Sequence, residues 1–244
     1  MQKLISYPLS VVYYLLFLLI LLVFHPIQWV CFNWFGYDAH KKSVDILNFF
    51  LTINTYILGT TYKVENLERL PQGVPIIIAA NHQSLYDISG ILWFMRKVHP
   101  KFISKIELGK GIPSISYNLN HGGSVLIDRK DAKQSLSAIK KMADYIETTK
   151  RTAVIFPEGT RSKTGKPGPF AENGLKILCK YAPSAYIVPV TINNSWKMTK
   201  WGSFPMGLGN KLIFTIHEPF AVKDLPFTEI FERVEKEVVE AIIL

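Results

Sequence analysis

From Thr61 onward, short apolar runs alternate with segments of helical periodicity. Some runs, such as residues 76–80 and 153–156, are continuously apolar, which is typical of strands buried on both faces of a largely parallel sheet. The alternation therefore predicts an α/β fold. The expected strands are residues 62–65, 75–80, 101–104, 123–128, 152–156, 185–191 and 211–217, and the expected helices are residues 87–96, 133–149, 173–181 and 227–243.

The N-terminal part has a different character, because no charged residue lies between Lys3 and Asp38. Residues 9–24 are apolar apart from one serine and two tyrosine hydroxyls. As a helix they would be roughly 24 Å long, just short of the ~30 Å hydrocarbon core of a bilayer. Pro26 is expected to interrupt this helix, and residues 27–35 add a second apolar piece with tryptophans suited to a membrane interface.

A third segment, residues 44–58, is amphipathic at helical spacing and ends at Gly59. A single spanning helix and a re-entrant or interfacial helix pair both fit these segments, and an ordinary core helix fits residues 44–58 equally well. A signal peptide is disfavoured, because the N-terminus has one lysine and no small-x-small cleavage site follows. We expect a membrane-anchoring helical region at residues 1–60 and an α/β domain at residues 61–244.

The positive charge is concentrated in one part of the chain. The net charge is +9, and residues 96–180 hold 17 Lys+Arg against 7 Asp+Glu. This block suits an anionic partner such as nucleic acid, anionic lipid or a phosphorylated substrate, although a solvated surface has the same composition. The apolar N-terminus and the lack of a nucleic-acid motif disfavour nucleic acid. Cys31 and Cys179 have no metal-ligand spacing, so we expect neither a disulfide framework nor a zinc site.

Chemically useful side chains follow three of the expected strands, where an open α/β sheet binds its ligands. His82 and Asp87 follow residues 76–80, Arg129 follows residues 125–127, and Glu158 and Arg161 follow residues 154–156. If His82 lies in the turn and Asp87 in the first turn of the next helix, the carboxylate can orient the imidazole as a base. The alternative is a histidine that only satisfies a helix N-terminus. Since no G-x-S-x-G motif occurs, the base would act directly on a substrate hydroxyl.

The cationic residues point to an anionic ligand. Arg129 and Arg161 have the fork geometry that matches phosphate or carboxylate, and Lys105 is a third candidate. A surface ion pair with a neighbouring aspartate is the simpler interpretation for Arg129. Glu158 directly follows an apolar strand and needs a partner if it is buried, while Gly159 permits close approach of the backbone to a ligand.

Four ordered motifs between about residues 62 and 220 resemble those of the glycerolipid acyltransferase family. Residues 81–87, Asn-His-Gln-Ser-Leu-Tyr-Asp, resemble its N-H-x4-D motif, and residues 156–162, Phe-Pro-Glu-Gly-Thr-Arg-Ser, match its third motif. Residues 123–129 resemble the second motif, residues 188–190 the fourth, and residues 105–113 a family segment between the first two. Within this family, the sequence most resembles the bacterial 1-acyl-sn-glycerol-3-phosphate acyltransferases.

This resemblance implies a mixed, mainly parallel sheet flanked by helices, with N-terminal helices that associate with the membrane. It implies transfer of a fatty acyl group from acyl-CoA or acyl-carrier protein to the sn-2 hydroxyl of lysophosphatidate, with no metal ion or other cofactor. His82 would be the base and Asp87 its partner. The other implied residues are Lys105, Arg129 and Arg161 at the acceptor phosphate, and Glu158, Gly159 and Thr160 at the glycerol site.

The motifs leave the acceptor open, since another lysolipid such as a lyso-aminolipid or a lysophospholipid fits them too. A non-catalytic protein that binds anionic lipid is a further alternative, which the intact His82 and Asp87 disfavour. A hydrolase is disfavoured by the missing serine motif. We expect the protein at the cytoplasmic face of the cell inner membrane, with lipid and an acyl thioester as its partners and no nucleic acid.

Overall fold

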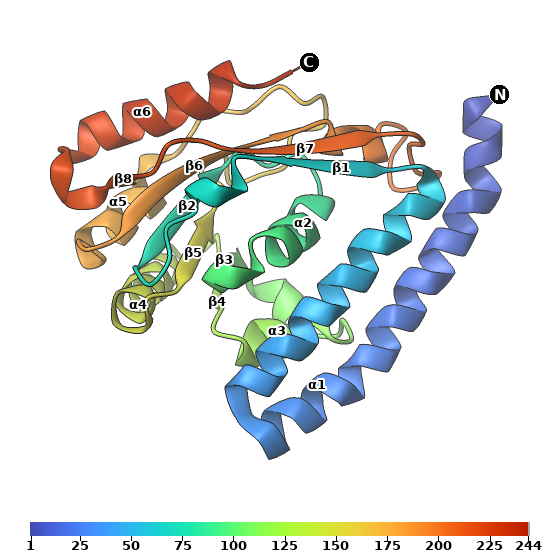
Figure 1. Cartoon of the computed structure of the whole chain (residues 1–244), viewed down its shortest axis with the longest axis horizontal. Helices are drawn as coiled ribbons and strands as arrows, with labels where there is room; N and C mark the ends of the chain where they lie inside the picture. The colour runs from blue at the N-terminus through green and yellow to red at the C-terminus, as the bar shows by residue number, and fades with distance from the viewer. Residues whose placement is uncertain (244) are drawn as a thin grey trace.

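The computed structural model describes residues 1–243, and within them eight strands form one mixed sheet (Figure 1). The strand order is β1-β7-β6-β2-β5-β3-β4, with β8 paired to β6. Only β7 and β8 pair antiparallel, both with β6, so the expected mainly parallel sheet is confirmed. The strands are β1 (Thr61–Glu65), β2 (Ile76–Ala80), β3 (Pro100–Lys105), β4 (Val125–Ile127), β5 (Thr152–Ile155), β6 (Tyr186–Asn193), β7 (Lys211–Ile216) and β8 (Phe220–Ala221).

Helices cover both faces of the sheet, as Figure 1 shows for α2 (Tyr86–Phe94) and α6 (Phe227–Glu240). All residues of β2 are buried, and they alternate between two apolar cores. Ile76 and Ile78 belong to the core that includes α2, whereas Ile77 belongs to the core formed with α6, α4 (Ala132–Thr149) and α5 (Glu172–Tyr181). A strand buried on both faces is what the continuous apolar run predicted.

The expected elements agree with the structure to within a few residues, but two short ones were not predicted. The strand β8 has only two residues, and α3 (Ile115–His121) has seven, too few for a clear periodic pattern. The helix α3 packs against the N-terminal helix, where the Ser114 hydroxyl donates to the Leu21 carbonyl at 2.6 Å. Tertiary contact therefore supports a segment whose own sequence gives a weak signal.

The prediction that Pro26 interrupts the first helix is wrong. The helix α1 (Gln2–Asn54) continues through Pro26, and its non-helical residue is Gly36, with φ 78° and ψ −168°. A proline inside a helix removes one hydrogen bond and can be tolerated with a kink, whereas a positive φ of this size is readily adopted only by glycine. The expected stop is confirmed: a 3₁₀ turn (Thr55–Leu58) follows, and Gly59 has φ 68°.

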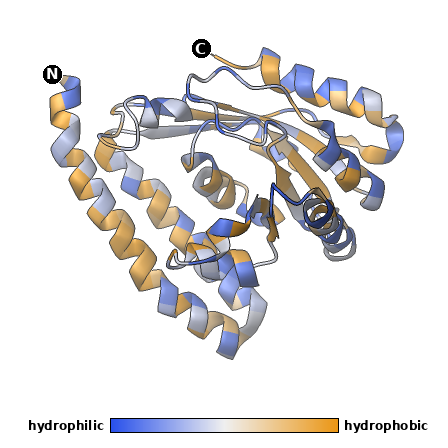
Figure 2. Ribbon diagram, turned by 180° about the vertical axis from the view of Figure 1, so that it is seen from behind, coloured by the Kyte–Doolittle hydropathy of each residue, from blue (hydrophilic) through white to orange (hydrophobic). Residues whose placement is uncertain are grey.

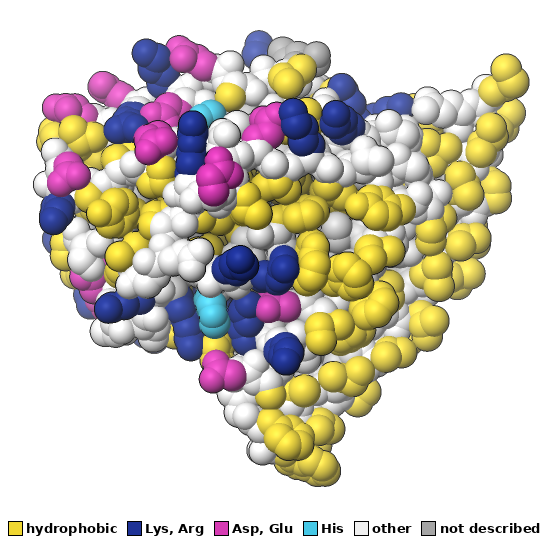
Figure 3. Space-filling model, viewed as in Figure 1, with side chains coloured by type: hydrophobic (Ala, Val, Ile, Leu, Met, Phe, Trp, Pro, Cys, Tyr) yellow, Lys and Arg dark blue, Asp and Glu magenta, His cyan; other side chains and the backbone are white. Residues whose placement is uncertain are grey.

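Gly36 divides α1 into two limbs that lie side by side as a helical hairpin (Figure 1). Leu21 and Phe24 of the first limb pack against Leu47 and Leu51 of the second. The outer side of the first limb is apolar and exposed, as Figures 2 and 3 show. By length and composition, Gln2–Leu58 is the one helix within the described residues that could cross a membrane.

Candidate active site

The turn between β2 and α2 wraps around the carboxylate of Asp87. The backbone N–H groups of Gln83 and Ser84 donate to Asp87 Oδ2 at 2.7 and 2.9 Å. The Ser84 hydroxyl also accepts from the N–H of Tyr86 at 3.1 Å, which supports the start of α2. The carboxylate is therefore fixed by the local fold, and its residue is 0% exposed.

His82 lies in this turn, which is the placement that its contact with Asp87 requires, and its Nδ1 is 2.8 Å from Asp87 Oδ2. A carboxylate only accepts hydrogen bonds, so Nδ1 carries the proton and Nε2 is left as the basic nitrogen. The imidazole stacks on Phe156, with ring centroids 4.0 Å apart and planes 13° apart. The ring is thus oriented by one hydrogen bond and one stacking contact.

The loop after β5 holds the backbone of His82 from both sides. Glu158 Oε1 accepts from the His82 N–H at 2.7 Å, and the His82 carbonyl accepts from the N–H of Ser162 at 2.8 Å. The second Glu158 oxygen accepts from the N–H of Gly168 at 2.8 Å. Burial raises the pKa of the Glu158 carboxyl, and these two backbone donors partly offset that effect. The partners of the half-buried Glu158 carboxylate are therefore backbone N–H groups.

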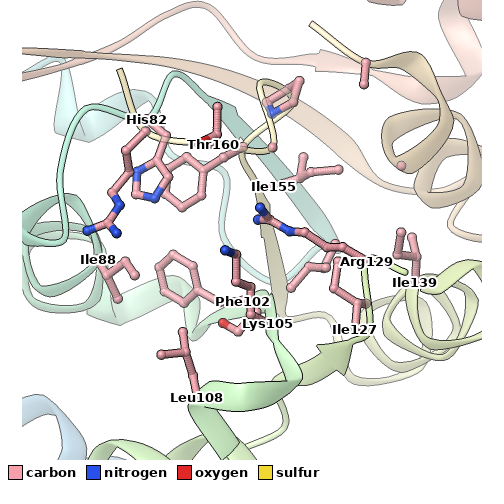
Figure 4. Close-up of a pocket in the computed structure, with 18 of the residues that line it drawn as sticks. His82, Ile88, Phe102, Lys105, Leu108, Ile127, Arg129, Ile139, Ile155 and Thr160 are labelled. Atoms are coloured by element: carbon pink, nitrogen blue, oxygen red, sulfur yellow. The ribbon is translucent and has the colours of Figure 1, made fainter. Parts of the chain in front are cut away.

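A cavity of about 460 Å³ opens beside His82 at the carboxyl ends of the strands (Figure 4). Lys105, Arg129 and Arg161 all line it, as do Gly159 and Thr160. In Figure 4 the cationic ends of Lys105 and Arg129 extend toward the middle of the cavity. These residues therefore converge on one place although they come from three separate strand ends.

Among residues 1–243 none of these three cations forms a salt bridge. The neighbouring aspartates are occupied otherwise: Asp128 accepts from the N–H of Lys130 at 2.9 Å, and Asp131 caps α4 through the N–H of Gln134. The simpler interpretation of Arg129, a surface ion pair with one of these aspartates, is therefore wrong. Exposed cations without a counter-charge at a cavity suit an anionic ligand.

The rest of the cavity wall is mainly apolar. One part adjoins His82 and contains Leu85, Ile88, Phe102 and Leu108. The other part lies toward α4 and α5 and contains Ile127, Ile139, Ile155 and Gly174. A Cβ on Gly174 would lie 2.6 Å from Ile155 Cδ1, so the absence of a side chain there keeps this end of the cavity open.

The third motif forms the rim through a tight turn. The N–H of Gly159 donates to the Phe156 carbonyl at 2.9 Å, and Gly159 has φ 65°, which favours glycine. Gly159 and Thr160 are exposed at the cavity, whereas Glu158 is half-buried beside it and does not line it. Glu158 acts on the site through the backbone of His82.

Three further polar residues complete the site, and the sequence analysis gave them no role. Asn81 accepts from the N–H of Ile192 at 2.7 Å and donates to its carbonyl at 2.8 Å, which ties the turn to β6. Gln83 accepts from the N–H of Ser195 at 3.1 Å. The hydroxyl of Ser195 donates to Asp87 Oδ1. Asn81 and Gln83 could be suspected from their place beside His82, but no sequence signal marks Ser195.

The fold and the site suit an acyltransferase domain, and comparison with known proteins agrees. The family model described as Acyltransferase matches residues 61–193, so the chain belongs to this family. The solved structure of the 1-acyl-sn-glycerophosphate acyltransferase PlsC from Thermotoga maritima is similar over 98% of this chain and 95% of that one. The TM-score is 0.79 at 25% sequence identity. Because the match covers 98% of this chain, it includes the N-terminal hairpin as well as the sheet.

Curated relatives show the same similarity at sequence level. The chain is 31% identical to a 1-acyl-sn-glycerol-3-phosphate acyltransferase of Helicobacter pylori, over 68% of this chain and 69% of that protein. It is 28% identical to a chloroplastic enzyme of the same name from Brassica napus, over 75% of this chain and 52% of that protein. The chain thus spans about half the length of the plant relative.

Proposed function

We propose that this chain transfers a fatty acyl group from an acyl thioester to the sn-2 hydroxyl of lysophosphatidate, giving phosphatidate for phospholipid biosynthesis. The observation that carries the proposal is a single cavity in which the His82–Asp87 pair, three exposed cations and an apolar compartment meet. The names of the relatives concern the same acceptor and support the choice.

In the proposed reaction, His82 Nε2 takes the proton of the acceptor hydroxyl while the oxygen attacks the thioester carbonyl carbon. The new C–O bond forms first, the C–S bond then breaks, and the leaving thiolate receives the proton from His82. Asp87 keeps Nδ1 protonated throughout and stabilises the transient imidazolium. His82 returns to its starting state, so no covalent enzyme intermediate is needed.

The three cations are proposed to hold the acceptor phosphate. A phosphate monoester carries up to two negative charges, which the guanidinium forks of Arg129 and Arg161 and the ammonium of Lys105 can bind. Gly159 and Thr160 at the rim would contact the glycerol. Glu158 is proposed to act indirectly, by fixing the backbone of His82.

The apolar compartment toward α4 and α5 is proposed to take an acyl chain, and the donor is proposed to be acyl-CoA or acyl-carrier protein. The chemistry needs neither a metal ion nor another cofactor, because the base comes from the chain and the leaving group from the donor. The exposed apolar side of α1 would lie in the membrane surface. Basic segments next to membrane helices tend to stay on the cytoplasmic side, so the basic block at residues 96–180 would place the site at the cytoplasmic face of the inner membrane.

The test is an assay of the purified chain in mixed micelles with lysophosphatidate and a long-chain acyl thioester, measuring phosphatidate and free fatty acid. We expect phosphatidate from the wild type and a kcat roughly 10²–10⁴-fold lower for His82→Ala, as for removal of a general base. His121→Ala is a matched control, because His121 is exposed and does not line the cavity.

Wild-type turnover by His82→Ala would remove this histidine from the chemistry. Product from other lysolipids but not from lysophosphatidate would change the acceptor. Free fatty acid as the main product would indicate hydrolysis, and no product from any donor and acceptor would indicate a lipid-binding protein.

A further inference from the structure

The catalytic carboxylate has two oxygens with different partners. Asp87 Oδ2 accepts from the His82 ring and from two backbone N–H groups. Asp87 Oδ1 accepts from the Ser195 hydroxyl and, at a long 3.3 Å, from the Ser84 hydroxyl. The Ser195 hydroxyl is therefore the main partner of the oxygen that does not face His82.

Ser195 is held rigidly in the position from which it reaches Asp87. It begins a 3₁₀ turn (Ser195–Thr199) directly after Asn194, which has φ 70°. Its N–H donates to Gln83, and the preceding strand is tied to Asn81 at Ile192. Ser195 and Asp87 are both 0% exposed, so this hydrogen bond is shielded from bulk solvent.

We propose that Ser195 is a positioning residue of this active site, whose hydroxyl holds the Asp87 carboxylate in the orientation that His82 requires. The proposal rests on the function proposed above. Ser195 is 108 positions from Asp87 and lies beyond residues 61–193, the part that matches the family model. It does not line the cavity, so it acts through Asp87 and not on the substrate.

Two consequences follow from removing the hydroxyl. The carboxylate loses the main partner of Oδ1, one of the contacts that oppose rotation about its Cβ–Cγ bond, so the His82 ring is held less firmly. Because the lost hydrogen bond is made to a charged group, we expect a loss in kcat of about 10-fold to 100-fold, which corresponds to about 1.4–2.7 kcal/mol. KM should change little, because the cavity lining is intact.

The second consequence concerns charge. The hydroxyl dipole presents its positive end to Asp87, so its removal makes the potential at His82 more negative and favours the imidazolium. The acid side of the pH profile of kcat/KM should therefore move to higher pH. The other ionisable groups near the pair are Glu158, Tyr62 and the cavity cations Lys105, Arg129 and Arg161, and none of them is hydrogen-bonded to Ser195.

The experiment compares Ser195→Ala, which lacks the hydroxyl, with Ser195→Thr, which keeps it. Ser89→Ala is the matched control, since Ser89 is a buried serine on α2 whose hydroxyl donates to the Tyr86 carbonyl and not to Asp87. We expect Ser195→Ala to lose kcat and to show the shifted pH profile, Ser195→Thr to regain most of both, and Ser89→Ala to resemble the wild type.

A second measurement does not depend on turnover. In protein labelled at histidine, NMR follows the protonation of the His82 ring, assigned with His82→Ala. We expect the titration midpoint of His82 to move to higher pH in folded Ser195→Ala and to remain unchanged in Ser89→Ala. An unmoved midpoint together with wild-type kcat would overturn the role of Ser195. If wild-type protein forms no phosphatidate yet the midpoint moves, the proposed function fails while the coupling of Ser195 to the pair holds.

Discussion

The buried ammonium of Lys101 should lower the stability of this protein at neutral and acidic pH. Lys101 is 6% exposed near the start of β3, and among residues 1–243 its ammonium has no hydrogen bond or salt bridge. Burial, followed by the positive charges of Arg151 and Lys41, lowers its pKa from 10.5 to about 7, while Asp45 acts in the opposite direction.

The magnitude follows from this difference of about 3.5 units, each of which corresponds to about 1.4 kcal/mol. Below pH 7 the side chain is charged in both the folded and the unfolded state, and the folded state bears a cost of up to about 5 kcal/mol. Between pH 7 and 10.5 the unfolded chain binds more protons, so stability rises with pH, and above pH 10.5 the cost is gone. The Tyr37 ring, 5.1 Å from the ammonium, offsets only about 0.5–2 kcal/mol.

Lys101→Met replaces the ammonium with an uncharged chain of similar length. We expect it to stabilise the detergent-solubilised protein by about 2–5 kcal/mol at pH 6, with the gain shrinking toward zero near pH 10. Denaturant midpoints at pH 6 to 10 for the wild type, Lys101→Met and Lys97→Met, an exposed control, measure this. A destabilised Lys101→Met at pH 6, or a difference that does not vary with pH, would refute the reasoning.

Two further predictions concern the cavity. Arg161→Ala should raise KM about 10-fold or more for a phosphorylated acceptor and less for an uncharged one, because a charge-assisted contact to phosphate is lost. Equal effects on both acceptors would argue against that contact, and so would the same effect in Lys166→Ala on the same loop. Gly174→Val should shift donor preference toward shorter acyl chains, because the valine side chain would enter the cavity near Ile155. The activity measured over a series of acyl-chain lengths tests this. Asn173→Val is the control, since Asn173 does not line the cavity, and the same profile in both variants would contradict the prediction.

The central part of the fold could be predicted from sequence because its signal is local and strong. Residues 76–80 and 153–156 are continuous apolar runs, and they supply most of β2 and β5 in the middle of the sheet. The runs also locate the strand ends, and an α/β fold brings the carboxyl ends of parallel strands together. The predicted convergence of three cations is therefore found, in Lys105, Arg129 and Arg161. Predicting it required only the general geometry of a parallel sheet.

The bend in the N-terminal hairpin could not be predicted in the same way. Pro26 is the stronger local signal against a helix, yet the chain bends at Gly36. The position of the bend is decided by packing between the limbs, since Leu21 and Phe24 must lie opposite Leu47 and Leu51. A bend at Pro26 would place Phe24 at the tip of the hairpin, where it could not make this contact.

The same distinction between local and distant partners explains what was found and missed at the site. His82 and Asp87 are five positions apart, so one turn between β2 and α2 is enough to bring them together, and the predicted strand end at Ala80 makes that turn possible. The groups that hold them come from Glu158 and Ser195, 76 and 108 positions away, and depend on how β5 and β6 flank β2. From sequence, the Glu158 carboxylate could equally bind a ligand in the cavity or accept hydrogen bonds from backbone N–H groups. Only the register of the strands decides between these two roles. Sequence therefore identifies the atoms proposed to react, whereas the atoms that hold them emerge only with the assembled sheet.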